Sequence, residues 1–207
     1  MQIKKQRMGP LGTNCYLVWA EASQEAMLID PAGRKERICE LLDGFTGQVK
    51  YIVLTHGHPD HVSGVKAAKE ITQAPALIHR LDAPMLDEHD NMIARYLGIT
   101  EPLPQADRLL EGGEKLQLGK LTFEVIHTPG HTEGGIVLFG EGVLFSGDTL
   151  FAGSIGRCDL PGGNWEVLKD SLRRLMTLPS DTVVYPGHGE ATSIAEELVH
   201  NRYLPEL

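Results

Sequence analysis

Three histidines and an aspartate lie within six consecutive residues of the segment LTHGHPDHVSG (54–64), directly after the apolar run YIVL. They are His56, His58, Asp60 and His61. Imidazole and carboxylate groups bind zinc, iron and manganese, and the residue types alone do not choose among these metals. Pro59 ends the extended segment, so Asp60 and His61 are expected to open the following helix, where Asp60 could also be an N-cap. The segment indicates a metal site.

The remaining candidate ligands follow three other apolar segments. The strand LTFEVIH is followed by TPGHT with His131, GVLFSG is followed by Asp148, and TVVYPG is followed by His188. Strand ends at one edge of a sheet layer lie close together in space, so side chains from four segments can converge there. Five histidines and two aspartates exceed the three protein ligands of a single catalytic ion. They fit two ions about 3.5–4 Å apart that share a carboxylate.

Four other histidines are interpreted as structural, because they lie at ordinary strand ends or on helix faces: His79, His89, His127 and His200. His127 lies only four residues before His131 but belongs to the strand, whereas His131 follows a Pro-Gly turn that can present it. The candidate metal site therefore leaves these four out.

Short apolar runs bounded by glycine, proline, asparagine or aspartate recur along the chain and are typical of strands. We expect strands in residues 14–20, 26–31, 49–55, 75–79, 121–128, 135–140, 142–148 and 181–187. Helical periodicity predicts helices in residues 34–45, 60–72, 85–98, 164–178 and 190–204. Asn164 is the expected N-cap of the fourth helix, and residues 98–114 are the most loop-like stretch. This order indicates a layered α/β fold with a β core, formed by a single domain of residues 1–207.

Composition narrows the classes of partner and location. The chain has 207 residues, with 19 basic and 28 acidic side chains and a net charge of −9. No long basic stripe exists to meet phosphates, and Lys4, Lys5 and Arg7 are interpreted as a solvated strand face, so we expect neither a nucleic acid nor a membrane as partner. No signal peptide or membrane span is indicated. Three widely spaced cysteines without a C-x-x-C pair predict a cytoplasmic protein.

The motifs T-H-x-H-x-D-H, G-H-T, G-D-T and P-G-H occur in this order over most of the chain, and together they resemble the metallo-β-lactamase superfamily. The resemblance implies a four-layer αββα sandwich with a dinuclear site at one edge. It implies zinc, with iron or manganese as alternatives. By resemblance the first ion is held by His56, His58 and His131, and the second by Asp60, His61 and His188, with Asp148 bridging them.

Within the superfamily, the segment GDTLFAGSIGRCDLPGG (147–163) is similar to the glyoxalase II branch, the hydroxyacylglutathione hydrolases, in their short form. This implies a small thioester as substrate, an S-acylglutathione such as S-lactoylglutathione, with Asp60 and Asp148 as catalytic residues. Arg157 then corresponds to a substrate-binding residue, with a loop-capping role as the alternative. The tyrosine expected after the last ligand histidine is missing from HGEAT, and the chain reaches Leu207 without the helical domain of the long enzymes. These departures leave the carrier thiol open.

The chemistry expected from two ions is hydrolysis, because they lower the pKa of a shared water toward ~7 and polarise an acyl carbonyl. A thiolate leaving group needs little protonation, and no G-x-S-x-G motif supplies a nucleophile. One alternative is a mono-iron persulfide dioxygenase with His56, His131 and Asp148 as ligands. A flavodiiron module is disfavoured by His58, where that family has glutamate, and nothing favours a non-catalytic metal-binding protein. The sequence does not indicate the oligomeric state.

A few further residues receive structural interpretations. Asp30, in LIDPAG, is expected to brace the ligand loop or its own turn. Cys158 is interpreted as an incidental loop thiol, because no neighbour in the sequence lowers its pKa. Trp165 and Tyr203 are expected to pack, with a place in a pocket wall as the alternative for each.

Overall fold

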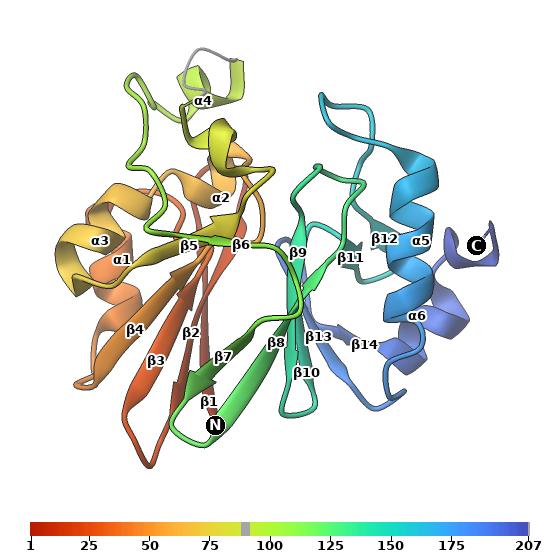
Figure 1. Cartoon of the computed structure of the whole chain (residues 1–207), viewed down its shortest axis with the longest axis horizontal. Coiled ribbons are helices and arrows are strands. Elements are labelled where there is room, and N and C mark those ends of the chain that lie inside the picture. Colours follow the sequence, from red (N-terminus) through yellow and green to blue (C-terminus); the bar gives the residue numbers. More distant parts are fainter. Residues whose placement is uncertain (88–91, 207) are drawn as a thin grey trace.

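The apolar runs of the sequence form two six-stranded sheets that face each other, as the computed structural model of residues 1–87 and 92–206 shows (Figure 1). The first sheet has the order β1 (Gln2–Met8), β2 (Thr13–Ala20), β3 (Glu25–Ile29), β4 (Gln48–Val53), β5 (Ala76–His79) and β6 (Arg108–Leu110). The second has the order β14 (Thr192–Ser193), β13 (Val183–Pro186), β10 (Val143–Gly147), β9 (Ile136–Gly140), β8 (Leu121–His127) and β7 (Lys115–Leu118). A small hairpin joins β11 (Leu150–Phe151) to β12 (Ser154–Ile155).

Strand direction determines which loops share an edge. In the first sheet β3, β4, β5 and β6 run parallel, so the segments after β3, β4 and β5 leave from one edge. In the second sheet β10 and β13 are parallel, and β8 runs the same way because β9 is antiparallel to both β8 and β10. The segments after β8, β10 and β13 therefore also leave from one edge, and all of the candidate ligands lie on such segments.

Helices cover the outer faces of both sheets (Figure 1). On the first sheet lie α1 (Lys35–Leu42), α2 (Pro59–Val62) and α3 (Val65–Thr72), and on the second lie α5 (Trp165–Leu175) and α6 (Ile194–His200). The 3₁₀ turn η1 (Ala83–Asp87) and helix α4 (Met92–Tyr96) extend above the first sheet, and η2 (Leu204–Glu206) follows α6. The order helix, sheet, sheet, helix is the four-layer αββα sandwich that the resemblance implied.

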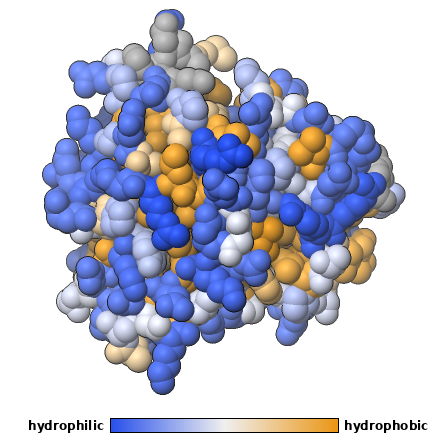
Figure 2. Space-filling view, viewed as in Figure 1, coloured by the Kyte–Doolittle hydropathy of each residue, from blue (hydrophilic) through white to orange (hydrophobic). Residues whose placement is uncertain are grey.

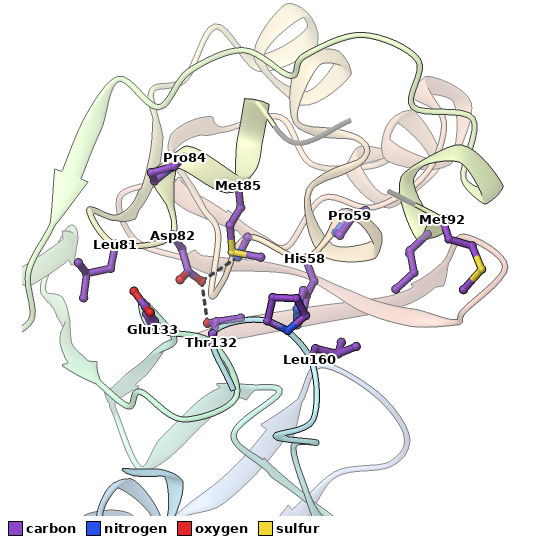
Figure 3. A pocket seen from close by; sticks show the side chains of 14 residues that line it. His58, Pro59, Leu81, Asp82, Pro84, Met85, Met92, Thr132, Glu133 and Leu160 are labelled. Carbon is purple, nitrogen blue, oxygen red and sulfur yellow. Dashed lines mark hydrogen bonds between the residues drawn. The ribbon is translucent and has the colours of Figure 1, made fainter. Parts of the chain in front are cut away.

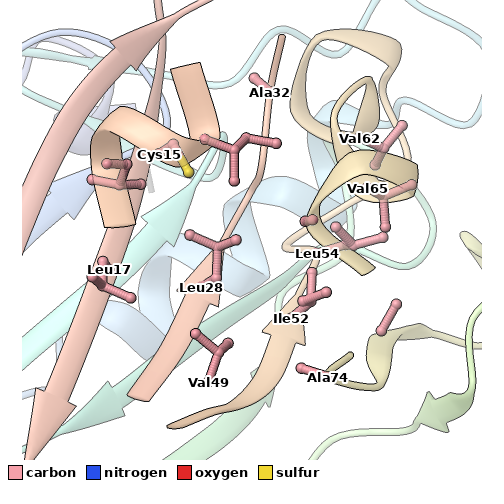
Figure 4. Close-up of a cluster of buried hydrophobic side chains, with 14 of the residues drawn as sticks. Cys15, Leu17, Leu28, Ala32, Val49, Ile52, Leu54, Val62, Val65 and Ala74 are labelled. Carbon is pink, nitrogen blue, oxygen red and sulfur yellow. The ribbon is translucent and has the colours of Figure 1, made fainter. Parts of the chain in front are cut away.

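Strands β2, β3, β5 and β10 are covered on both faces and buried along nearly their whole length, which explains why they are largely apolar. In β2, Cys15 and Leu17 pack among the side chains between the first sheet and its helices, drawn in Figure 4. The alternate residues Tyr16 and Val18 pack between the two sheets. Because successive side chains of a strand point to opposite faces of the sheet, one strand contributes to two hydrophobic cores.

The outer layer of the second sheet depends on α5. Leu168, Leu172 and Leu175 are spaced at helical intervals and pack against that sheet. The helix begins after Asn164 as predicted, because the Asn164 side chain accepts a hydrogen bond from the amide of Val167 at 3.2 Å.

Several boundaries differ from the prediction. Residues 98–114 contain strand β6, which pairs with the edge of β5, so this stretch is only partly a loop. The helix predicted for 60–72 is two helices, because Gly64 lies against the carbonyls of Pro31 and Gly33 and the chain turns there. The helix predicted for 85–98 is replaced by η1 and α4, with 88–91 outside the described residues, and the helix predicted for 190–204 begins only after β14.

The surface in Figure 2 is largely hydrophilic, with apolar atoms gathered in the middle of that face between the two halves of the sandwich. Within residues 1–87 and 92–206, no helix is long and apolar enough to cross a bilayer. A single domain for residues 1–207 stays a prediction.

Candidate metal centre

The seven predicted ligands converge where the two sheets meet. His56, His58, Asp60 and His61 follow β4 of the first sheet, and the other three follow β8, β10 and β13 of the second. Their ligand atoms form three groups, in each of which all atoms lie within 4.8 Å of one another: His56, His58 and His131; His56, His61 and Asp148; Asp60, His61 and His188. The prediction that four separate segments meet at one point is therefore confirmed.

The first group, which we term the three-histidine half, is His56, His58 and His131. All three side chains are buried. Nδ1 of His58 lies 2.9 Å from Nε2 of His131. His131 donates its Nδ1 proton to the carbonyl of Arg157 at 2.7 Å, which leaves a lone pair on Nε2 directed toward His58. Two ring nitrogens that face each other in this way are placed to share a cation.

The second group, which we term the acidic half, is Asp60, His61 and His188. Nε2 of His188 lies 3.2 Å from both Nε2 of His61 and Oδ2 of Asp60. The His188 side chain is 29% exposed, whereas that of His61 is fully buried. Asp60 is the second residue of α2, whose N-cap is His58, and no side-chain cap is formed. Asp60 instead accepts a hydrogen bond from the Thr13 hydroxyl at 3.1 Å, so the N-cap alternative is wrong.

Asp148 lies between the two halves. Its Oδ1 is 3.3 Å from Nε2 of His61. Its Oδ2 is 3.7 Å from Nε2 of His131 and 3.6 Å from Nε2 of His188. One carboxylate thus reaches both halves, as a bridging ligand must.

Asp30 orients two of the histidines, which confirms its predicted bracing role. Its carboxylate accepts hydrogen bonds from the amide and the hydroxyl of Thr55, each at 2.7 Å, and from Nδ1 of His61 at 2.9 Å. The Thr55 hydroxyl oxygen in turn lies 3.1 Å from Nδ1 of His56. Asp30 accepts the protons of His61 Nδ1 and of the Thr55 hydroxyl, so the Thr55 oxygen in turn accepts the Nδ1 proton of His56. Nε2 is therefore the nitrogen of each ring that can bind an ion.

Two buried polar atoms at this site have no hydrogen-bond partner among the described residues: Nε2 of His56 and Oδ1 of Asp148. Leaving such atoms unpaired costs about 1–3 kcal/mol each. Both belong to side chains whose other atoms are held in place, and both are good donors to a divalent ion. The residues present therefore fit bound metal.

The two halves have opposite electrostatic character before any ion binds. Burial lowers the pKa of His56 well below its usual value, and neighbouring histidines add to this. Burial, with His131, lowers the pKa of His58 to about 4. Burial disfavours the charged form of His61 too, yet Asp148 and the other carboxylates outweigh it and hold the pKa of His61 well above its usual range. His56 and His58 thus present neutral lone pairs, whereas the acidic half presents charge.

Asp82 was not identified from the sequence, although it ties the two ligand loops together. This buried carboxylate accepts hydrogen bonds from the Gly57 amide at 3.0 Å, the Thr132 hydroxyl at 2.7 Å and the Gly134 amide at 2.6 Å. One loop carries His58 and the other carries His131. Asp82 lies in an ordinary turn after β5, so no local signal marks it.

The His188 loop is held by the opposite sheet, which the sequence also did not reveal. Asn14 donates from Nδ2 to the carbonyls of Pro186 and Gly189, both at 2.9 Å. The Tyr16 hydroxyl donates to the carbonyl of Pro186 at 2.6 Å. Asn14 follows the turn GPLGT and is fully buried, and a polar residue inside an apolar strand run is the only signal that could have marked it.

Gly187 must be glycine because the site closes around it. A Cβ there would lie 2.2 Å from Oδ1 of Asp148 and 2.7 Å from Cε1 of His61. Real Cβ atoms do not approach other heavy atoms this closely, so any side chain would displace a ligand. The P-G-H motif therefore requires glycine at this position for a steric reason.

Arg157 lies at the surface beside the site. Its guanidinium binds Asp159 through two hydrogen bonds of 2.8 and 2.7 Å, and its side chain is 60% exposed. Its carbonyl holds His131, and this is independent of the side chain. Substrate contact by Arg157 stays a prediction. Burial raises the pKa of neighbouring Cys158, in agreement with an incidental thiol.

Of the four histidines interpreted as structural, the three that the structure describes lie outside the ligand cluster. The His79 and His127 rings stack 4.0 Å apart, and Nε2 of His127 lies 2.9 Å from the carbonyl of Glu133. His200 is exposed next to Glu196. His89 lies outside the described residues.

Comparison with known proteins identifies the family. The model of the metallo-beta-lactamase superfamily matches residues 8–188. Hydroxyacylglutathione hydrolase GloC of Haemophilus influenzae is 35% identical, and the match covers 92% of each chain. Two solved structures are similar. BLEG-1 B3 metallo-beta-lactamase superposes with a TM-score of 0.90 and is 36% identical, and the match covers 98% of this chain and 99% of that one. TTHA1623 in a di-iron-bound form superposes with a TM-score of 0.86 and is 38% identical, and the match covers 97% of this chain and 99% of that one. The chain belongs to the metallo-beta-lactamase superfamily, whose members are mostly metal-dependent hydrolases that bind divalent ions.

Proposed function

We propose that this protein is a dinuclear metal-dependent hydrolase that cleaves a small thioester of the S-acylglutathione type, such as S-lactoylglutathione. The observation that carries the proposal is the position of Asp148, whose two oxygens reach both halves of the ligand cluster. The 35% identity to a hydroxyacylglutathione hydrolase supports the thioester. The similar di-iron-bound structure supports two ions.

The seven ligands would be divided between two ions. His56, His58 and His131 would hold the first ion, and Asp60, His61 and His188 the second, with Asp148 shared. Zinc is our first choice because imidazole-rich sites suit it, and iron or manganese are the alternatives. When bound, two such ions lower the pKa of a coordinated water toward ~7 and neutralise charge that develops on an acyl oxygen.

The chain's own residues contribute orientation and charge. Asp30 and the carbonyl of Arg157 hold the Nδ1 protons of His61 and His131, so these rings present fixed lone pairs. Asp60 and Asp148, which we propose as catalytic, keep the site anionic enough to bind two cations. The reaction breaks the C–S bond, forms a C–O bond with water and releases a thiol and a carboxylic acid, so no oxidant is needed.

The test is metal analysis followed by assay. Protein reconstituted separately with zinc, iron or manganese is expected to contain two ions per chain and to hydrolyse S-lactoylglutathione, and Asp148→Ala should do neither. No turnover of any thioester with any of the metals would contradict the proposal. One iron per chain together with oxygen consumption on glutathione persulfide would instead identify the mono-iron dioxygenase. A β-lactam belongs in the same assay because BLEG-1 is named a B3 metallo-beta-lactamase.

We also propose that Arg157 binds substrate after release from Asp159. Arg157→Ala leaves the backbone carbonyl that holds His131 in place, so metal content should not change. Loss of a charge-assisted hydrogen bond of about 1.5–3 kcal/mol should lower kcat/KM roughly 10- to 100-fold. Asp159→Ala, which frees the guanidinium, is the matched control and should retain activity. A change in melting temperature with unchanged kinetics would restrict Arg157 to a loop cap.

The cellular location and the partners of the protein are also proposed. The three cysteines are unpaired, which supports a cytoplasmic location, and the acidic balance of the chain supports a small molecule rather than a nucleic acid or membrane as partner.

A further inference from the structure

A cavity of about 540 Å³ lies beside the three-histidine half (Figure 3). His58 and Thr132 form part of its wall on the side of the ligand cluster. The volume falls in the range of about 300–1,000 Å³ typical of small-molecule sites. Because His58 belongs to both the cavity wall and the ligand cluster, a molecule that occupies this cavity has its nearest end at the metal centre.

Most of the other lining residues are apolar, and the larger ones come from η1, α4 and the loop after Arg157. Met85 lies in η1, Met92 and Ile93 in α4, and Leu160 in the loop after Arg157. In Figure 3 His58 lies between Met85 and Leu160, and Met92 lies farther to the side, beyond Pro59. Methionine side chains adapt their shape to apolar ligands of different outline. The wall therefore favours burial of hydrocarbon.

The charges around the cavity disfavour an acidic ligand. Among the described lining residues the only carboxylates are Asp82 and Glu133, and none is lysine or arginine. The oxygens of Asp82 are occupied by Gly57, Thr132 and Gly134, and Glu133 is exposed at the rim. Carboxylates such as those of glutathione are normally bound by cationic side chains, and no lysine or arginine is among the described lining residues.

We propose that this cavity binds an uncharged, apolar substituent of the thioester, and that the preferred substrate carries such a group. This inference rests on the proposed thioester hydrolysis, and it favours an apolar thioester over S-lactoylglutathione, whose lactoyl and glutathione parts are both polar. The reaction is unchanged: the C–S bond breaks, a C–O bond forms with water, and thiol and acid leave. The apolar substituent can belong to the acyl group or to the thiol, and the shared chemistry is an alkyl chain placed beside His58.

Two series of neutral thioesters test the proposal. One lengthens the acyl chain from acetyl to hexanoyl on a fixed uncharged thiol, and the other lengthens an alkanethiol that carries a fixed acetyl group. Each buried methylene should raise kcat/KM about three- to fourfold in one of the two series, until the wall is reached. The series that shows the increments identifies which side of the thioester occupies the cavity.

Variants of the lining residues test whether the effect of chain length on kcat/KM depends on the cavity. Leu160→Lys should abolish the increments, and Met92→Lys, at a position that is 84% exposed and safe for folding, should reduce them. The matched control is Leu198→Lys, on the outer helix α6 at 53% exposure, which should retain the wild-type increments. Metal content, measured for each variant, should equal that of the wild type, since none of these residues is a predicted ligand.

The outcomes separate the two claims. Thioester hydrolysis with no chain-length dependence in either series, or with Leu160→Lys and Met92→Lys indistinguishable from Leu198→Lys, overturns the cavity assignment and leaves the proposed function standing. If no thioester is hydrolysed, the proposed function fails, and calorimetry with neutral alkyl thioethers decides about the cavity. Affinity that rises with chain length and is lost in Leu160→Lys supports an apolar site, and absence of binding overturns it.

Discussion

The two halves of the ligand cluster are organised by different forces. The three-histidine half is buried, and its ring protons are held by neutral acceptors, the Thr55 hydroxyl and the Arg157 carbonyl. The acidic half is organised by charge: His61 lies between Asp30 and Asp60, and His188 is partly exposed. The packing that holds the buried histidines in place does not depend on salt, whereas salt screens the attraction between charges that are partly exposed. We therefore expect chelators and salt to remove the ion of the acidic half first.

The largest effect should come from Asp148, because it serves both halves. Asp148→Ala removes the shared carboxylate and leaves two nearby cations with less compensating charge. We expect metal content to fall from about two ions per chain to less than one, with activity lost in parallel. Elemental analysis of dialysed protein measures this. A variant that still bound both ions as tightly as the wild type would show that Asp148 does not bridge the halves.

A more selective loss is expected from His188→Ala. Among the candidate ligands, His188 lies next to Asp60, His61 and Asp148, so the three-histidine half should keep its ion while the other is lost. His200→Ala, an exposed histidine on α6, is the control and should retain both ions. Two ions in the His188 variant would remove this residue from the ligand set.

Asp30→Asn should weaken both halves unequally. The carboxylate holds His61 directly but reaches His56 only through Thr55. Loss of such an orienting partner typically costs 10- to 100-fold in metal affinity, and we expect most of this in the acidic half. Competition titrations with a chelator would resolve the two affinities. Equal weakening of both would contradict the division of roles.

The smallest effect concerns pH in metal-free protein. Burial and neighbouring His131 hold the pKa of His58 at about 4, below the ~6.5 of an unfolded chain. A lowered histidine pKa contributes stability that is present above pH ~6.5 and is lost as the pH falls toward 4, by at most about 3 kcal/mol. Asp60, whose pKa is lowered mainly by His61 and His188 against the effect of burial, begins to lose its contribution only below ~4.

Melting temperatures of the metal-free protein between pH 7.5 and 4.5 test this difference between the halves. The wild type and a His200→Gln control should lose stability on acidification, and His58→Gln should lose less. The same pH slope in all three proteins would mean that burial of His58 does not set the acid sensitivity of the three-histidine half.

The convergence of the seven candidate ligands could be predicted from the sequence, because each lies in a segment that follows a recognisable apolar strand. Strand ends carry both a local pattern and a place in space, so His131 and Asp148 were assigned to one edge without any contact being known. The same reasoning separated His127, inside its strand, from His131. The four-layer fold followed from the resemblance, since strand patterns alone gave only a layered α/β arrangement.

The supporting residues could not be predicted, because their roles depend on partners far away in the chain. Asn14 binds the carbonyl of a residue 172 positions away, and Asp82 binds the amide of Gly57 from 25 positions away. Asp82 lies in an ordinary turn, and the one local signal at Asn14 is a polar residue inside an apolar strand run. Strand β6 was missed for a related reason: three residues form a strand there only because the edge of β5 is available to pair with them.

The two side chains that reach from β2 to the loop of His188 have a consequence for folding order. Asn14 and Tyr16 lie in the first sheet, and the carbonyls they hold belong to the second. Contacts so distant in sequence form only after long loops have closed, which is entropically costly and therefore late. The acidic half of the cluster is then completed last during folding and opens first when the sheets separate at this edge. An ion held by Asp60, His61 and His188 would join the two sheets at this edge and so act as a latch between the two halves of the chain.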